Sequence, residues 1–101
     1  MAVTYTERDR CLRARLAGEL DHHGAREVMQ ELDRQIDAAL PRELVLDLEG
    51  LTFTGSSGIA VLLRAWRQMG RIQGTMRVVN TPGQADRVFR AAGLQRIIRF
   101  E

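Results

Sequence analysis

Segments with helical spacing alternate with short apolar runs along this chain, and this alternation restricts the fold more than any other feature. The expected helices cover residues 21–40, 56–70 and 81–92, and the apolar runs cover 44–48, 75–79 and 97–100. Strands that alternate with helices need crossover connections, which produce a mostly parallel sheet with helices packed on it. At 101 residues the chain is long enough for one such domain, over 1–101, and too short for two.

The first twenty residues predict a β-hairpin ahead of this alternation. Leu12, Ala14 and Leu16 alternate with polar residues, the period of two that a half-buried strand shows, and residues 7–10 form a polar turn before them. The run 44–48 is almost continuously apolar, which is typical of a strand covered on both faces. The predicted class is therefore α/β, with an N-terminal hairpin followed by alternating helices and strands around a mostly parallel central sheet.

Cap and turn residues indicate where the helices begin and end. Asp21 is placed to cap the first helix. We expect a loop over 49–55, then a second helix that ends in a left-handed residue at Gly70. Thr81 is the expected cap of the third helix, with Pro82 at its first helical position. The large apolar helix residues that we assign to the core are Leu62, Trp66 and Phe89.

Composition excludes several classes of protein. Fifteen basic residues, all arginines, are spread along the chain against thirteen acidic ones, whereas a nucleic-acid binder gathers its positive charge on one face. No apolar run approaches the roughly 20 residues of a membrane helix, and the N-terminus has no signal-peptide pattern. The single cysteine, Cys11, forms no internal disulfide and is either a reactive thiol or a half-exposed structural residue. We expect a cytoplasmic monomer that binds neither nucleic acid nor membrane.

The usual signatures of catalysis, cofactor binding and metal binding are missing. No glycine-rich phosphate loop is present. His22 and His23 are adjacent, so on a helix they point about 100° apart, and no third histidine completes a metal site. The segment 55–58 lacks the G-x-S-x-G spacing of a hydrolase nucleophile, and both histidines precede it. The sequence therefore predicts a protein that is not an enzyme and holds neither metal nor cofactor.

The serine pair after the buried strand allows two interpretations. In the structural one, Ser56 caps the second helix and Gly58 is small so that the helix approaches the sheet. In the functional one, Ser56 is an exposed phosphorylation site. A phosphate adds about −1.5 to −2 charges, which a helix N-terminus tolerates but a partner packed on the same spot does not.

Five segments in order along the chain resemble one known family. They are 18–23, 46–48, 51–58, 93–94 and 97–100. Together they are similar to a STAS domain, and more narrowly to the bacterial anti-sigma factor antagonists of the sporulation and general-stress type. The chain ends at Glu101, before the further C-terminal helix that many members of this family carry.

The resemblance implies a partner-switching function. An antagonist of this family binds an anti-sigma factor, which is also a serine kinase of the histidine-kinase-like ATPase superfamily, and so releases a sigma factor. The kinase phosphorylates the antagonist and breaks the complex, and a metal-dependent serine phosphatase restores it. The family's phosphoacceptor matches Ser56, and the serine and glycine that follow it match Ser57 and Gly58.

The same resemblance implies a partner-binding rim and shows one departure from the family. The acidic residue that the family uses for partner contact matches Asp21, with Glu19, His22 and His23 on the same rim. The family has an aspartate before its serine pair where this chain has Gly55. An alternative function follows from that change: a STAS scaffold subunit of a transport or stress-sensing assembly that is not phosphorylated.

Overall fold

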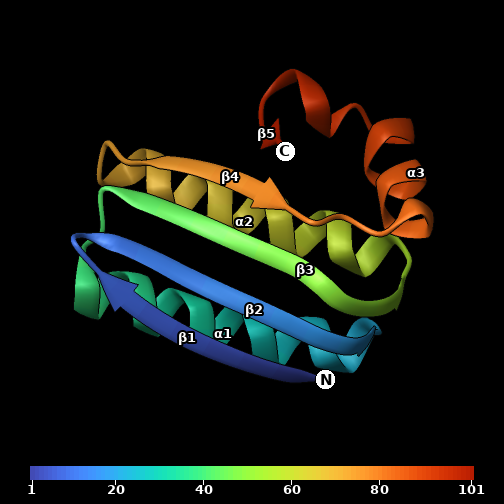
Figure 1. Cartoon of the computed structure of the whole chain (residues 1–101), viewed down its shortest axis with the longest axis horizontal. Coiled ribbons are helices and arrows are strands. Elements are labelled where there is room, and N and C mark those ends of the chain that lie inside the picture. Colours follow the sequence, from blue (N-terminus) through green and yellow to red (C-terminus); the bar gives the residue numbers. More distant parts are fainter.

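Five strands form one sheet, and two helices cover one of its faces (Figure 1). The computed structural model describes all 101 residues. The strands, which lie in the order of the sequence, are β1 (Ala2–Arg8), β2 (Cys11–Leu20), β3 (Glu43–Thr54), β4 (Thr75–Val79) and β5 (Arg99–Phe100). β1 is antiparallel to β2, and every other neighbouring pair is parallel. The predicted α/β class, hairpin and mostly parallel sheet are confirmed.

The helices occupy two positions relative to the sheet. They are α1 (His22–Ala39), α2 (Ser56–Arg71), α3 (Gly83–Ala91) and the short 3₁₀ helix η1 (Leu94–Arg96). In Figure 1, α1 and α2 lie together behind the sheet, whereas α3 and η1 lie beyond the β4 edge. None of the helices combines the length and apolar character that crossing a membrane requires.

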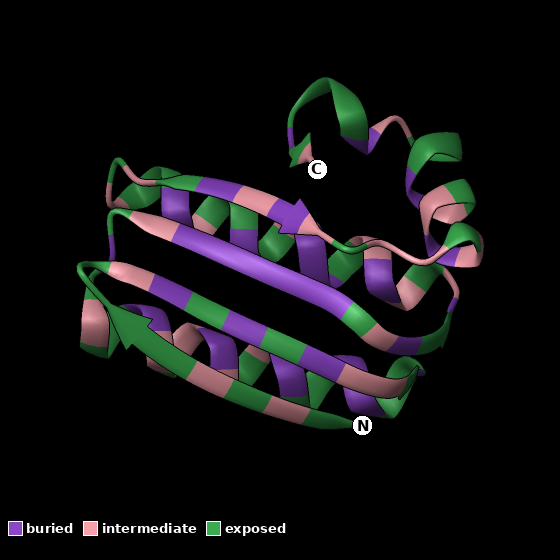
Figure 2. Ribbon diagram, in the orientation of Figure 1, coloured by how far each residue is buried: buried purple, intermediate pink, exposed green.

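The core lies between the sheet and the two helices behind it. Along β2, the predicted alternation is confirmed, because Leu12, Ala14 and Leu16 are buried and the residues between them are exposed (Figure 2). Leu62 from α2 and Phe89 from α3 are fully buried as expected, and the Phe89 ring stacks on Phe100 with a centroid distance of 6.0 Å. Burial of such side chains is the main favourable term in folding.

The middle of β3 is buried on both faces, but the two faces are covered differently. Leu44, Leu46 and Leu48 belong to the core cluster, whereas Val45 does not, although it is only 1% exposed. Asp47 alternates with these leucines on the face that no helix covers, and Arg13 Nη2 lies 2.8 Å from Asp47 Oδ2. The prediction that this strand is buried on both faces is confirmed. Helices cover one face, and charged side chains such as Arg13 and Asp47 cover the other.

Several predicted boundaries are wrong. The expected loop 49–55 is mostly strand, because β3 continues to Thr54 in parallel pairing with β2. Gly50 allows this pairing, since a Cβ there would lie 2.9 Å from the Cβ of Ala17. The second helix continues past Gly70, and the left-handed residue is Gln73, with φ of 59°.

The third helix and the core contain two further corrections. Pro82 rather than Thr81 is the N-cap of α3, and the Thr81 hydroxyl is buried without a hydrogen-bond partner. Trp66 is 39% exposed and is not a core residue. The reason is that β5 pairs with β4 only at Arg77 and Val78, so the sheet ends before it covers this part of α2.

Candidate functional site

The carboxyl ends of β2 and β3 form the edge on which the sequence places its functional residues. In the parallel pairing of these strands, Glu19 lies opposite Phe53 and Leu20 lies opposite Thr54. α1 begins two residues after Leu20, and α2 begins two residues after Thr54. The structure therefore brings the rim 19–23 and the segment 55–58 to one edge, which is where open α/β sheets bind ligands and partners.

The start of α1 follows the sequence prediction closely. Asp21 is the N-cap, and its Oδ1 accepts a hydrogen bond of 2.7 Å from the backbone N–H of Gly24. His22 and His23 are exposed in the first turn, and His23 Nε2 lies 3.0 Å from Glu27 Oε1. No group of three or more His, Cys, Asp or Glu side chains in the chain is arranged to hold a metal ion.

The start of α2 differs from the structural interpretation of the serine pair. Gly55 is the N-cap, with no side chain to accept a hydrogen bond, and Ser56 is the first helical residue and is exposed. The expectation that Ser56 caps the helix is therefore wrong. Because its first turn has neither a side-chain cap nor an acidic residue, α2 presents backbone N–H groups that can donate hydrogen bonds to an anion.

Gly58 has the packing function that the sequence predicts. It is buried, and a Cβ at this position would collide with Thr54 Oγ1 and lie 3.2 Å from the Phe89 ring. Only glycine allows α2 to begin this close to β3. Gly55 has no such constraint, since a Cβ there would meet nothing within 4 Å and its φ of −114° suits any residue.

A pair of hydrogen bonds from α3 holds the end of β3 next to the serine pair. The Thr54 N–H donates to Gln84 Oε1 at 3.0 Å, and Gln84 Nε2 donates to the Thr54 carbonyl at 2.7 Å. Thr54 is fully buried, so these bonds satisfy backbone groups that water does not reach. The sequence analysis did not anticipate Gln84, because its partner lies 30 positions away and no local pattern connects them.

Phe53 is a second residue of this edge to which the sequence analysis gave no function. Its side chain is 49% exposed, opposite Glu19 across the strand pair. Exposed aromatic side chains surrounded by polar residues are typical anchors of protein interfaces. The signal that could have identified Phe53 as an interface residue is its closeness in sequence to Ser56, which it precedes by three positions.

Away from this edge, Asp47 and Cys11 have pKa values that their surroundings shift. Burial alone would raise the pKa of Asp47, but hydrogen bonds from Asn80, Arg13 and the Glu49 N–H outweigh it and lower that pKa from its ordinary value. Burial raises the pKa of the Cys11 thiol, and Glu43 beside it raises the pKa further. A raised pKa disfavours the reactive thiolate, so the structural interpretation of Cys11 is the better one.

Comparisons with known proteins cover nearly the whole chain. The STAS domain family matches residues 2–101. An anti-sigma F factor antagonist from Paenibacillus polymyxa is 33% identical over 84 residues, which are 83% of this chain and 72% of that protein. The family match covers residues 2–101, and the structure is an α/β sheet. The chain therefore belongs to the STAS domain family.

Two solved structures give a closer comparison within that family. The anti-sigma factor antagonist SpoIIAA in its unphosphorylated form superposes with a TM-score of 0.86 at 25% identity, over 99% of this chain and 88% of that one. The Bacillus cell fate determinant SpoIIAA in its phosphorylated form superposes with a TM-score of 0.77, also at 25% identity, over 99% of this chain and 91% of that one.

Proposed function

We propose that this chain is an anti-sigma factor antagonist that acts by binding rather than by catalysis, and that phosphorylation of Ser56 switches the binding off. The observation that carries the proposal is the position of Ser56. It is an exposed hydroxyl at the first turn of α2, on the edge that also holds the rim 19–23. The resemblance to antagonists known in phosphorylated and unphosphorylated forms supports the same conclusion.

Phosphorylation at Ser56 is compatible with the fold. A dianion beside the first N–H groups of α2 gains from the helix dipole, and no acidic side chain in that turn opposes it. In a complex the same charge would have to leave water at the contact, which is costly without a cationic partner. The modification therefore acts on association and leaves folding intact.

The proposed interface combines polar residues with one apolar anchor. Its polar members are Glu19, Asp21, His22, His23, Ser56 and Ser57. Gly55 lies between the two groups without a side chain, and the buried Gly58 sets how closely α2 approaches β3. The exposed ring of Phe53 lies on the same edge and supplies apolar contact area. The partner we propose is an anti-sigma factor with serine kinase activity of the histidine-kinase-like ATPase superfamily. A metal-dependent serine phosphatase would reverse the modification in the cytoplasm.

Gly55 favours a second candidate function. The family aspartate would place a carboxylate beside the acceptor serine, and this chain has no side chain there. A STAS scaffold that binds a partner constantly, without phosphorylation, fits this change. Because a Cβ at position 55 meets nothing within 4 Å, Gly55→Asp is expected to fold and restores the missing carboxylate.

Intact-mass analysis tests the proposal. The protein is incubated with ATP, magnesium and the candidate anti-sigma kinase from the same genome, alongside Ser56→Ala and the matched control Ser57→Ala. One phosphate on the parent and on Ser57→Ala, with none on Ser56→Ala, is the expected result. An unmodified parent that still binds an active kinase would favour the scaffold, and phosphorylation of Gly55→Asp alone would identify Gly55 as the cause.

A further inference from the structure

β1 forms an open edge of the sheet. It stands first in the strand order and pairs with β2 alone. In Figure 1 no other element lies beyond it, and none of the backbone hydrogen bonds made by turns, loops and caps involves a residue of β1. An edge strand whose backbone groups have no partner can pair with a strand of another chain.

The hairpin turn determines which backbone groups of β1 point outward. Only Asp9 and Arg10 separate β1 from β2, and both have positive φ, of 54° and 63°, as in a type I′ turn. The residues that flank such a turn, Arg8 and Cys11, form a hydrogen-bonded pair, and bonded pairs then alternate along the two strands. The even-numbered residues of β1 therefore bond to β2. The residues whose N–H and C=O groups point outward are Val3, Tyr5 and Glu7.

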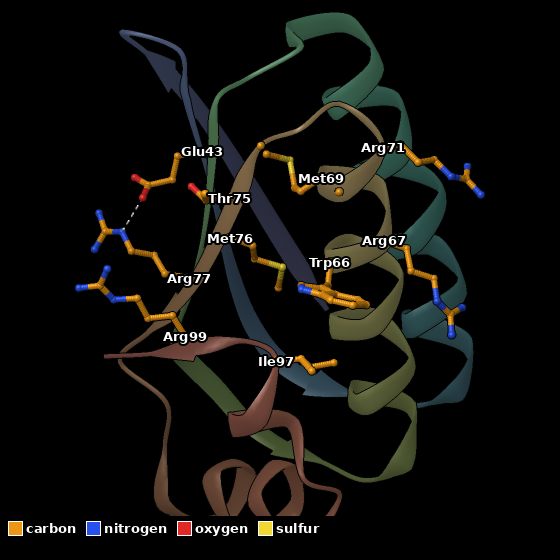
Figure 3. Close-up of a pocket in the computed structure, with 12 residues that line it drawn as sticks. Glu43, Trp66, Arg67, Met69, Arg71, Thr75, Met76, Arg77, Ile97 and Arg99 are labelled. Carbon is orange, nitrogen blue, oxygen red and sulfur yellow. Dashed lines mark hydrogen bonds and ion pairs between the residues drawn. The ribbon is translucent and has the colours of Figure 1, made fainter.

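The two edges of the sheet differ in how they are protected. At the far edge β5 has only two residues, and charged side chains lie there: Arg77 pairs with Glu43, and Arg99 pairs with Glu101. Figure 3 shows Arg77 and Arg99 extending to the same side of these strands. Short edge strands and charges are common means of preventing contact between sheets. β1 has seven residues in unbroken register with β2 and no proline, and its charged residues near the turn occupy only its last two positions.

β1 is complementary to a second copy of itself. In an antiparallel pair centred on Tyr5, Val3 of each copy lies opposite Glu7 of the other, and each outward N–H meets an outward C=O. The exposed Thr4 then lies opposite Thr6 of the second copy, and threonine pairs are favourable cross-strand contacts. The charged end of each strand lies opposite the uncharged start of the other, whereas a parallel pair would place each charge beside its like.

We propose that β1 is a dimerisation edge, at which two copies of this chain join their sheets through antiparallel pairing of β1 centred on Tyr5. A dimer would replace the expectation of a monomer, which rested on the small size of the chain. Two paired strands of seven residues make a small interface, so we expect weak association, with a Kd between about 10 μM and about 1 mM.

The proposed dimer leaves the candidate functional site of each copy open. The start of β1 lies at the same end of the sheet as the rim 19–23, because Ala2 pairs with Ala17. A twofold axis at Tyr5 reverses the direction of the second copy, so the two rims lie at opposite ends of the joined sheet. The dimer therefore presents two separate partner sites, and the proposal does not depend on the Ser56 switch.

Two measurements on the full chain test the dimer. Sedimentation velocity between about 10 μM and about 1 mM is expected to show an average mass that rises from that of one chain toward that of two. Amide hydrogen exchange followed by NMR locates the contact. The outward N–H groups of Val3, Tyr5 and Glu7 are expected to exchange at least about fivefold more slowly at the highest concentration, and those of Thr4 and Thr6 to change much less.

A proline variant tests the backbone pairing. Glu7→Pro removes one outward N–H and leaves the hydrogen bonds between β1 and β2 in place. Its matched control is Glu7→Ala, which loses the same carboxylate and keeps the N–H. Glu7→Pro is expected to weaken dimerisation at least about tenfold, and Glu7→Ala less than about twofold. Unfolding temperatures measured on dilute protein show that both variants are folded.

Two double variants test the register. Thr4→Lys/Thr6→Lys places like charges opposite one another in the proposed pairing, whereas Thr4→Glu/Thr6→Lys places a carboxylate opposite each ammonium group. The first variant is expected to dimerise at least about fivefold more weakly than the second.

Three results would overturn the proposal. The first is a chain that stays monomeric at about 1 mM. The second is a dimer that tolerates Glu7→Pro or shows no protection at β1, which would place the contact on another surface. The third is equal dimerisation of the two double variants, which would exclude the register centred on Tyr5. Phosphorylation of Ser56 is measured separately in the Glu7→Pro variant, so failure of the dimer leaves the proposed switch untouched.

Discussion

The two halves of β3 are held in place in different ways. Residues Glu43 to Asp47 pair with β2 on one side and with β4 on the other. Beyond Asp47 the strand pairs with β2 alone, and the register of that pairing shifts twice, between Arg15 and Ala17 and between Gly18 and Glu19. At the far end Thr54 still lies opposite Leu20 of β2, and its backbone N–H and C=O bond to the Gln84 side chain.

This difference separates what stabilises the fold from what positions the site. The first half has a ladder on both sides and leucines in the core, so changes there affect the whole molecule. The second half depends on one strand, one glycine contact and one side-chain clamp. Changes there are expected to alter the segment 55–58 while most of the fold survives.

Leu46→Ala is expected to have the largest effect, because it empties a fully buried position between two strands. A buried leucine replaced by alanine loses about 2–5 kcal/mol of unfolding free energy. Urea denaturation of parent and variant measures the loss. A value near that of an exposed-residue variant would show that the first half of β3 does not dominate stability.

Gly58→Val is expected to destabilise the protein by about 1–3 kcal/mol, because the added carbons collide with Thr54 and the Phe89 ring. Gly55→Ala is the matched control three positions earlier, where a Cβ has open space. Thermal unfolding of the two variants separates steric cost from the general cost of replacing glycine. Similar melting temperatures would contradict the close approach of α2 to β3.

Gln84→Ala is expected to remove about 1–2 kcal/mol of stability, since the buried N–H and C=O of Thr54 lose their partners. Because the clamp fixes the backbone just before Ser56, partner binding and phosphorylation rate should fall as well. Gln95→Ala, at an exposed position in η1, is the control. Lower stability with an unchanged phosphorylation rate would show that Gln84 does not position the site.

Asp47→Asn tests the ion pair and hydrogen bonds on the face of β3 that no helix covers. The variant is expected to lose about 1 kcal/mol of unfolding free energy at neutral pH. The pKa of Asp47 is lowered in the folded state, so its charge contributes stability above the unfolded pKa, about 3.9. That contribution is lost as pH falls through the folded pKa. The difference in unfolding free energy between parent and variant should stay constant above about pH 5 and shrink below about pH 4. A gap that persists in acid would assign the effect to packing.

Phe53→Ser is expected to have the smallest effect on stability, within about 0.5 kcal/mol, because the ring is 49% exposed. It should nonetheless weaken association with the anti-sigma factor. Calorimetric titration of parent and variant with that partner measures the change. Full affinity in the variant would remove Phe53 from the interface.

The sequence was sufficient to predict the parts of the fold that depend on local pattern. The alternation at Leu12, Ala14 and Leu16 identified the half-buried strand, and Asp21 identified the start of α1. The segment 49–54 contains a glutamate, a glycine and threonines, so its pattern resembles a loop, and only the distant partner β2 makes it a strand.

The errors at the site have the same cause. The N-cap is Gly55 rather than Ser56, and it follows directly on Thr54, which Gln84 holds by a contact across 30 positions. Trp66 has the spacing of a core residue, and its exposure follows from the length of β5 at the other end of the chain. The spacing of residues in the sequence identified the edge at the carboxyl ends of β2 and β3. The contacts that hold its residues in place come from distant parts of the chain and could not be predicted from that spacing.

The strand order has a consequence for biosynthesis. Since each strand lies next to the strand that precedes it in the sequence, a chain emerging from the ribosome can add every new strand to a neighbour already made. The clamp on Thr54 is the exception, because it comes from α3. A nascent chain that has produced both serines therefore holds them in an unfinished loop until Gln84 has emerged, and the segment that carries Ser56 is completed only after α3 has been made.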